Sequence, residues 1–483
     1  MRSRADAVAI TSVEPTCVEP MGQASFSLPA MGVADAESRE RAFVLFASLW
    51  AAATLFHVGS FNQWREHVVL AVAAAWVLCR PGSVAAVATL ALLQIERAAA
   101  FAPYISNHWL FTSLINAGFL LSVLYLVFKH RRLTVDRAEL FATFAPAARM
   151  ALIALYFFVV FHKLNADFFD PVVSCGVTFY AAQLSRLPWL PASPVFHVGS
   201  IYATIAIEAA IPLMLCVTRT RNIGILVGML FHYVVAMNPI SGFYNFSAML
   251  FAMFALFAPQ SLLSRPMIGS RAFRIGAVAV AVASGAIAVL VRVLPRTALP
   301  QLDLFLVLWD AYGAALIVAF AAHIWRSGTA MSDQRTPRLF AMPARALLVV
   351  PIAVFLNGIM PYLGLKTETS WAMFSNLRTE GDRSNHWVIP VSTQVFDFQR
   401  DLVQVTSSSD ESLQWVAKRH QLIPYFEVRR HPAASVSYLR DGVEARFARV
   451  SDDPRFSREI PATMRKLLWF RPIDPDEHER CRH

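Results

Sequence analysis

The sequence predicts an all-α polytopic membrane protein with about eleven transmembrane helices, followed by a small α+β domain. Of the 483 residues, 56% are hydrophobic and only 16% are charged, whereas about a quarter of the residues in a soluble protein are charged. Several apolar runs reach the length of about 20 residues that a helix needs to cross a bilayer. After residue 363 the composition becomes mixed polar and charged. The net charge of +10 is therefore assigned to loops and to this tail, and it does not indicate a nucleic-acid partner.

The first apolar segment follows a polar N-terminal arm. Residues 1–41 contain no apolar core of signal-peptide type and mix both charge signs, which favours a disordered cytoplasmic arm. A transmembrane domain is then predicted for residues 42–363. Its expected helices are 42–61, 66–79, 84–103, 107–128, 143–163, 196–217, 222–238, 241–258, 272–294, 302–325 and 345–363. Because segment 66–79 is short and Pro81-Gly82 follows it, the count could also be roughly ten or twelve.

The positions of the basic residues predict the orientation of these helices. Arginine and lysine gather in four connecting segments, which are 129–137, 219–221, 265–274 and 326–345. All four fall on one side of the membrane if the N-terminus is cytoplasmic, as the positive-inside rule requires. Arg292 and Arg296 are the main exceptions. We therefore expect a protein of the cell (inner) membrane with a cytoplasmic N-terminus and an exoplasmic C-terminus.

Residues 364–483 form the predicted exoplasmic α+β domain. Strands are expected at 395–398, 402–406, 435–439 and 443–450, and a helix at 412–420. The last two strands flank Asp441-Gly442, a pair typical of a type I′ hairpin turn. Residues 464–470 either pack on this domain or lie against the membrane, and packing is the favoured alternative.

The cysteines predict neither an obligatory disulfide framework nor a zinc site. The chain contains five, none in a CxxC pattern: Cys17, Cys79, Cys175, Cys216 and Cys481. Zinc sites and small disulfide-rich folds normally show closely spaced pairs. No metal is therefore expected.

Four polar residues within or at the ends of three apolar segments predict a functional cavity. Asn107 and His108 open one expected helix, Lys163 closes another, and His232 lies late in a third. In the predicted topology all four fall in the outer half of the membrane. Ionisable groups at membrane depth are costly and normally face the protein interior or a water-filled cavity. We therefore expect a cavity that opens to the exoplasmic side.

Each of these positions also has a simpler interpretation. Lys163 could be an interfacial anchor with its ammonium group among lipid headgroups, and Asn107 could be a helix N-cap. His108 could be an interfacial histidine, and His232 a hydrogen-bonded core histidine. Glu208, in the middle of a predicted helix, is most simply a structural partner for a polar group on a neighbouring helix.

These residue types suit the deprotonation of a quinol. A lysine in a poorly hydrated pocket gives up its proton more readily and can then act as a general base. A histidine at a helix N-terminus lies in a positive potential, which favours a neutral imidazole beside an anion. Together they could remove a phenolic proton and hold the resulting oxyanion. A lipid-borne quinol would reach such a site laterally from the bilayer.

Five segments resemble parts of the vitamin K-dependent gamma-carboxylase or of the wider group of HTTM (horizontally transferred transmembrane) domain proteins. Residues 162–168 (His-Lys-Leu-Asn-Ala-Asp-Phe) are similar to the carboxylase signature Lys-Lys-Leu-Asp-Ala-Asp-Trp. Residues 106–110 resemble its Asn-Asn-His segment, and the helix containing Phe231-His232 also has a counterpart. Residues 360–366 and 374–380 resemble the end-of-domain segment of HTTM proteins. The resemblance covers residues 40–385.

The resemblance implies roles for individual residues. Lys163 would be the base, Asn107 and His108 would support the oxyanion, and His232, with the signature residues His162 and Asn165, would contact the substrate or cofactor. The chain departs from the signature at His162 and Asn165, where the family has lysine and aspartate.

The implied cofactor is reduced vitamin K or a related quinol, with oxygen and carbon dioxide as co-substrates and a protein or peptide glutamate as a further partner. The tail is shorter than the lumenal region of the carboxylase, so the outcome could be carboxylation, epoxidation or another oxidation. The alternative is a non-catalytic membrane protein that binds or moves a lipid or small molecule.

Overall fold

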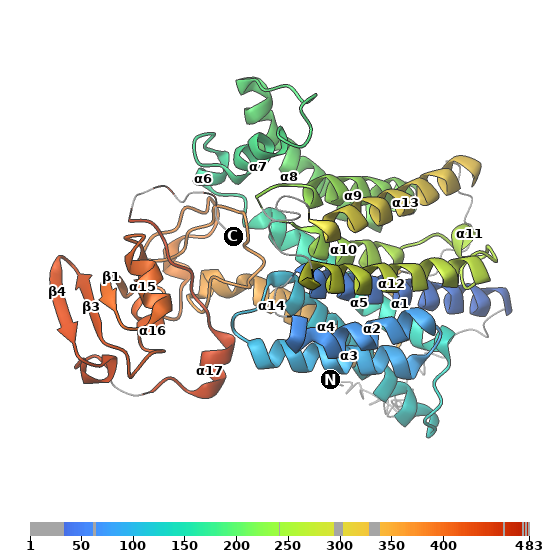
Figure 1. The fold of residues 1–483 in the computed structure, drawn as a ribbon, viewed down its shortest axis with the longest axis horizontal. Helices are drawn as coiled ribbons and strands as arrows, with labels where there is room; N and C mark the ends of the chain where they lie inside the picture. Colours follow the sequence, from blue (N-terminus) through green and yellow to red (C-terminus); the bar gives the residue numbers. More distant parts are fainter. Residues whose placement is uncertain are drawn as a thin grey trace, which may run out of the picture. The chain divides into compact units, whose positions relative to one another are not determined.

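The computed structural model describes residues 33–60, 64–240, 242–293, 303–327, 339–456, 459–475, 478 and 481. The protein is mostly helical, and a small antiparallel sheet lies near its C-terminus. The helices run side by side, and the sheet lies at one end of them, on the left in Figure 1. Residues 1–32 of the predicted arm lie outside the described residues.

Each of the eleven predicted apolar segments is helical, but not every helix has the length of a span. Within the described residues, eight helices are long and apolar enough to cross a membrane. These are α1 (Val33–Ser60), α3 (Val84–Phe101), α4 (Asn107–His130), α5 (Arg137–Phe161), α8 (Pro194–Cys216), α12 (Arg271–Val293), α13 (Leu304–Ser327) and α14 (Val349–Leu363). Three apolar helices are shorter: α2 (Trp64–Cys79), α9 (Arg221–Ala236) and α10 (Tyr244–Ala255). These three segments are helical as predicted, and each is shorter than the roughly 20 residues of a typical membrane span.

Two helices begin earlier than their apolar residues indicate. Helix α1 starts at Val33 rather than at residue 42, and Glu37 and Arg41 form an i,i+4 ion pair in the added turns. Helix α5 starts at Arg137 rather than at residue 143, because the side chain of Asp136 accepts a hydrogen bond from Glu139 N at 2.8 Å and caps the helix. Polar first turns of this kind are invisible to a hydropathy count.

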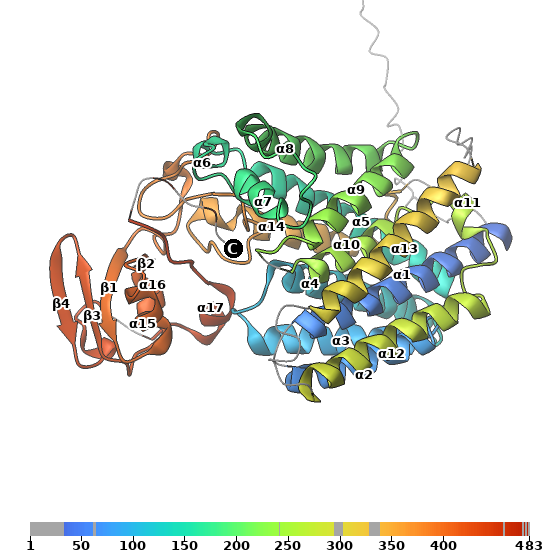
Figure 2. The ribbon, with the colours of Figure 1, turned by 45° about the horizontal axis from the view of Figure 1, so that its top comes forward.

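Helix α1 is the central helix of the transmembrane region. It contacts α2, α5, α10, α12 and α13, and 83% of its apolar window is buried inside the protein. Phe43, Phe46 and Phe56 on α1 are almost fully buried, and Phe56 meets Trp309 of α13 edge to face at 5.6 Å between ring centroids. Helix α12 is peripheral, since only 6% of its window is buried. Figure 2 shows α1 among the other helices and α12 at the margin.

Short helices connect α5 to α8. Helix α6 (Ala166–Phe169) is capped by Asn165, whose side-chain oxygen accepts a hydrogen bond from Phe168 N at 2.8 Å. Helix α7 (Cys175–Gln183) is capped in the same way by Ser174. The segment around Lys163 therefore turns sharply at the end of α5.

The tail contains a four-stranded antiparallel sheet with the order β2-β1-β3-β4. Its elements are β1 (Leu402–Ser408), α15 (Glu411–Ala417), β2 (Leu422–Pro424), α16 (Tyr425–Val428), β3 (Val436–Arg440), β4 (Val443–Phe447) and α17 (Ala462–Leu467). In the middle of the sheet Tyr438 pairs with Val405 on one side and with Ala445 on the other. Asp441 and Gly442 both have positive φ, 51° and 79°, as a type I′ turn requires, so this hairpin prediction is confirmed.

Two strand predictions in the tail need correction. Residues 395–398 are not a strand, because Phe396 N donates to Leu363 O at 3.0 Å and holds this segment against the end of α14. Strand β2 was not predicted, because its three residues include a proline and show no alternation.

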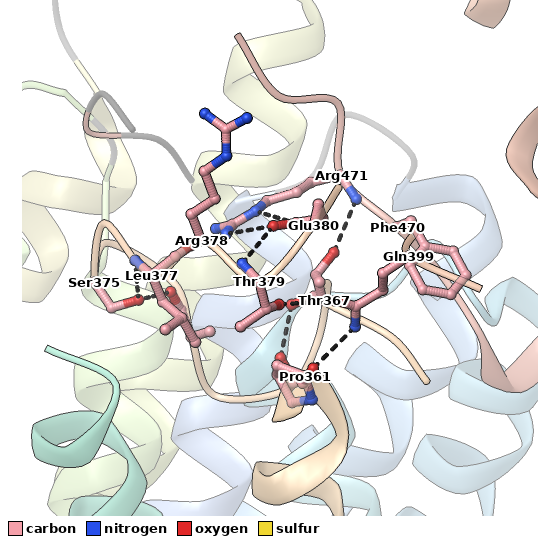
Figure 3. Close-up of polar contacts among 12 residues, drawn as sticks. Pro361, Thr367, Ser375, Leu377, Arg378, Thr379, Glu380, Gln399, Phe470 and Arg471 are labelled. Carbon is pink, nitrogen blue, oxygen red and sulfur yellow. Dashed lines mark hydrogen bonds and ion pairs between the residues drawn. The ribbon is translucent and has the colours of Figure 1, made fainter. Parts of the chain in front are cut away.

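The end of the chain is bonded to the segment that follows α14. The backbone nitrogens of Thr367 and Glu368 donate to Trp469 O at 3.2 and 3.1 Å. Arg471 Nε pairs with Glu380 Oε1 at 3.0 Å, and Arg471 N donates to Thr367 Oγ1 (Figure 3). Leu468 and Phe470 are buried. For these two residues the prediction of packing rather than membrane contact is confirmed.

The described residues contain one disulfide, which the sequence analysis did not identify. Cys175, the first residue of α7, is bonded to Cys481, with 4.7 Å between their Cα atoms. The two residues are 306 positions apart, so cysteine spacing could not indicate the bond. Cys79 and Cys216 are free and exposed, and Cys17 lies outside the described residues.

Peptide mapping will test this disulfide. We expect a Cys175–Cys481 linked peptide in a non-reducing digest, with Cys79 and Cys216 alkylated without reductant. Cys481→Ser should lower the free energy of unfolding by about 2–4 kcal/mol, because the unfolded chain loses a constraint. Cys216→Ser is the control and should leave unfolding unchanged. Alkylation of Cys481 in the unreduced protein would contradict the bond.

Candidate active site

Lys163 is buried at the end of α5 and forms an ion pair. Lys163 is only 5% exposed, which excludes the interpretation that its ammonium group is an anchor among lipid headgroups. Nζ lies 2.8 Å from Glu208 Oε2 of α8 and donates to Val159 O at 3.1 Å. Glu208 is itself buried, and its predicted role as a partner for a polar group on a neighbouring helix is confirmed.

The ion pair changes the electrostatic picture that the sequence suggested. The sequence pointed to an isolated amine, whereas in the structure Glu208 Oε2 lies within hydrogen-bond distance of Lys163 Nζ. Both residues line the same cavity, so the chemistry of the Lys163 amine has to be considered together with the Glu208 carboxylate.

Four of the predicted site residues line one cavity of about 150 Å³. Asn107 and His108 come from α4, Lys163 from the end of α5, and His232 from α9. Half of the other lining residues are aromatic: Phe111, Phe168, Phe179, Phe231, Phe243, Phe246, Trp371 and Phe374. A cavity of about this size can hold a single aromatic ring.

Asn107 and His108 lie in the first turn of α4. Ser106 occupies the N-cap position, so the simpler interpretation of Asn107 as the cap is wrong. Asn107 Oδ1 instead accepts a hydrogen bond from Trp371 N at 2.8 Å. His108 Nε2 lies 2.9 Å from Nδ1 of His57 on α1.

His232 has one ring nitrogen bonded within the protein and one that is not. Nε2 lies 2.8 Å from the hydroxyl oxygen of Tyr156 on α5. Nδ1 is buried and has no hydrogen-bond partner among the described residues. Because a buried polar atom without a partner is costly, Nδ1 is a candidate contact for a ligand in the cavity.

His162 and Asn165 do not line the cavity. His162 is fully buried, with Nδ1 at 2.8 Å from Tyr362 Oη and Nε2 at 3.1 Å from Ser370 O. Asn165 Nδ2 donates to the carbonyl oxygens of His162 and Ser375, both at 2.7 Å. Both side chains are therefore hydrogen-bonded within the protein, outside the lining of the cavity.

A loop after α14 completes the cavity, and the sequence did not indicate it. Trp371, Met373 and Phe374 line the wall. Trp371 and Phe374 have positive φ, 68° and 54°, which is uncommon for bulky residues and typical of functional sites. Asn376 Oδ1 accepts a hydrogen bond from Cys175 N at 2.8 Å. This loop therefore shares the cavity lining with Asn107, Lys163 and His232.

Two further buried residues are relevant to the site. His57 contacts His108 and was not singled out from the sequence, although its place near the outer end of the first predicted helix was a usable signal.

Lys366, just after α14, is a second buried amine: burial lowers its pKa to about 7, and Nζ donates to Thr369 Oγ1 at 3.1 Å. Lys366 is not part of the cavity wall. In the described residues no group of three His, Cys, Asp or Glu side chains is placed to hold a metal ion.

Fold and site together define a helical membrane protein with a buried, aromatic cavity that contains an ion pair and two histidines. Comparison with protein-family models, with curated proteins and with solved structures finds no match to the chain.

Proposed function

We propose that the protein is an integral membrane enzyme that binds a lipid-soluble quinol in this cavity and deprotonates it through Lys163. The observation that supports it most directly is the composition of one wall, where the Lys163–Glu208 pair, His108, His232 and Asn107 face a space bounded by aromatic rings. The size and aromatic lining fit one quinol ring, and His232 Nδ1 offers it a polar contact. When bound, a quinol would supply an ionisable phenol and the electrons that reduce oxygen.

The residues that line the cavity have two roles in this proposal: some take up the proton of the quinol, and others stabilise the oxyanion that forms. The Lys163–Glu208 pair can accept a second proton, after which both the amine and the carboxyl group are protonated. Because Asn107 Oδ1 is already bonded to Trp371 N, its amide Nδ2 is the group left to donate toward an oxyanion. His108, in the first turn of α4, lies where the helix dipole also favours an anion.

The resemblance to vitamin K-dependent gamma-carboxylase supports a more specific proposal. The cofactor would be reduced vitamin K or a related quinol, oxygen and carbon dioxide would be co-substrates, and a protein or peptide glutamate would be the acceptor. Epoxidation without carboxylation is an equally consistent outcome for a tail of this size.

Oxygen uptake by the purified protein tests the proposal. The protein in lipid nanodiscs is supplied with reduced vitamin K, a menaquinol or a ubiquinol, and we expect uptake above the protein-free rate with at least one of them. Mass spectrometry of the copurifying lipid would identify the bound compound. If no quinol supports uptake, the second candidate function holds: a non-catalytic protein that binds or moves a lipid or small molecule. The fully ion-paired state of Lys163 is the observation that favours this alternative.

The proposed location is the cell (inner) membrane, with the N-terminus in the cytoplasm and the tail on the exoplasmic side. The positive-inside rule supports this orientation. The disulfide of Cys175 with Cys481 supports it too, since disulfides persist mainly in oxidising compartments.

Reporter fusions will test this orientation. A fusion after Arg132, in the basic turn that follows α4, should report the cytoplasm. A fusion after Gly381, in the tail, should report the exoplasmic side. Both fusions on the same side would contradict the topology and the exoplasmic opening of the cavity.

A further inference from the structure

A second polar cluster adjoins the cavity, and its first member is a pair of histidines. His57 Nδ1 and His108 Nε2 lie 2.9 Å apart, and each residue is only 6% exposed. A hydrogen bond at this distance joins two imidazoles through one shared proton. Since His108 also lines the cavity, His57 is connected to the cavity through it.

A third histidine continues the row away from the cavity. His67, near the start of α2, is 1% exposed, and its ring centroid lies 6.0 Å from that of His57. At this separation a bridging water molecule can connect the two rings. Trp109 packs against both imidazoles, with centroid distances of 4.4 Å to His57 and 5.2 Å to His67. Three buried histidines in contact within apolar helices are unusual, because polar groups there are costly.

A small space beside the histidine pair is also polar. Its volume of about 10 Å³ is at the lower limit for one water molecule. The wall includes His57, His108, Thr54 and Gln94. Gln94 Nε2 donates to Thr54 Oγ1 at 2.6 Å, so these two side chains of the wall are hydrogen-bonded to each other.

We propose that His108, His57 and His67 form a proton relay between the cavity and the start of α2. The relay rests on the proposed function, because a buried base that takes up a proton in each turnover needs a route by which that proton leaves. Each imidazole can accept a proton on one ring nitrogen while it gives up the proton on the other. His108 would gain a proton at Nδ1 and pass its Nε2 proton to His57 Nδ1. His57 would pass its Nε2 proton toward His67. Each donating ring is neutral before and after the transfer, and one proton enters for each that leaves.

Two substitutions of His57 separate a relay from a structural role. His57→Gln keeps a hydrogen-bonding side chain beside His108 but cannot pass a proton, and we expect it to lower quinol turnover by about 10²-fold. His57→Ala should show a similar loss, and added imidazole should restore part of the activity by occupying the vacated space. His323→Ala is the matched control: His323 is 3% exposed and lies near Ser261 Oγ at 3.2 Å, away from the row. It should keep its turnover and show no response to imidazole.

The outcomes of this experiment are distinct. Full turnover by His57→Gln, or a loss in His57→Ala that imidazole does not reverse, would overturn the relay and leave the proposed function intact. If the wild-type protein turns over no quinol, the proposed function fails, and nitrogen-15 NMR of labelled histidines decides about the relay. A relay predicts that His57 and His108 exchange between tautomers and that His57→Gln abolishes the exchange at His108. One fixed tautomer at each ring would refute it.

Discussion

Lys163→Met should abolish quinol-dependent oxygen uptake and also destabilise the protein. Loss of a general base typically lowers a rate by about 10²–10⁴-fold. The same change leaves Glu208, 2.8 Å from Nζ in the native protein, without its partner in a buried position. Breaking one side of a buried ion pair typically costs about 3–5 kcal/mol. Oxygen uptake and unfolding in mixed micelles measure the two effects.

The double variant Lys163→Met with Glu208→Leu separates these effects. It removes both charges, and replacing a buried ion pair with apolar side chains is often neutral for stability. We therefore expect stability to return to near the wild-type value while oxygen uptake remains absent. Recovery of oxygen uptake in the double variant would show that Lys163 has a structural role only.

Arg471→Met should strongly destabilise the packing of the end of the chain against the segment that follows α14. Arg471 binds Glu380, which is fully buried, through Nε at 3.0 Å, and its Nη2 donates to Leu377 O (Figure 3). The substitution leaves the Glu380 carboxylate buried without its cationic partner. We expect a loss of about 3–5 kcal/mol in the free energy of unfolding, measured by chemical unfolding of the whole protein.

Arg449→Met provides the matched control for this prediction. Arg449 pairs with Asp452 at 2.9 Å on the surface of the same tail, and its side chain is 65% exposed. An exposed pair of this kind contributes about 0.2–1 kcal/mol. Equal losses for the two arginine variants would show that the Arg471–Glu380 pair does not hold the end of the chain to the segment that follows α14.

The site residues that could be predicted from the sequence are polar or ionisable residues within apolar segments. Lys163, His108 and His232 stand out in runs of hydrophobic residues, and a common membrane side could be inferred for them from the basic loops. The structure places all three in the lining of one cavity. The ion pair of Lys163 with Glu208 could not be predicted as a pair, because the facing of α5 and α8 depends on the packing of the whole helical region.

The remaining features depend on contacts between distant parts of the chain. Trp371 enters the cavity because Asn107, far earlier in the sequence, holds its backbone nitrogen, and neither residue type indicates this contact. His162 and Asn165 were expected to meet a ligand because of their place in the signature segment. Their bonds to Tyr362 and Ser375 satisfy both side chains from residues that hydropathy cannot place. The fold was more predictable, since the length of an apolar run marks a helix well and misses mainly the polar first turns, as at α1 and α5.

The bond between Cys175 and Cys481 has a consequence for how the protein is made. A ribosome releases Cys175 well before Cys481, with 306 positions between them, which at typical translation speeds takes roughly 15 to 60 s. During that interval the thiol of Cys175 awaits its partner while later helices are still being inserted. Cellular oxidants or another cysteine-containing chain could capture it first, so the yield of mature protein should depend on the thiol-handling enzymes of the host.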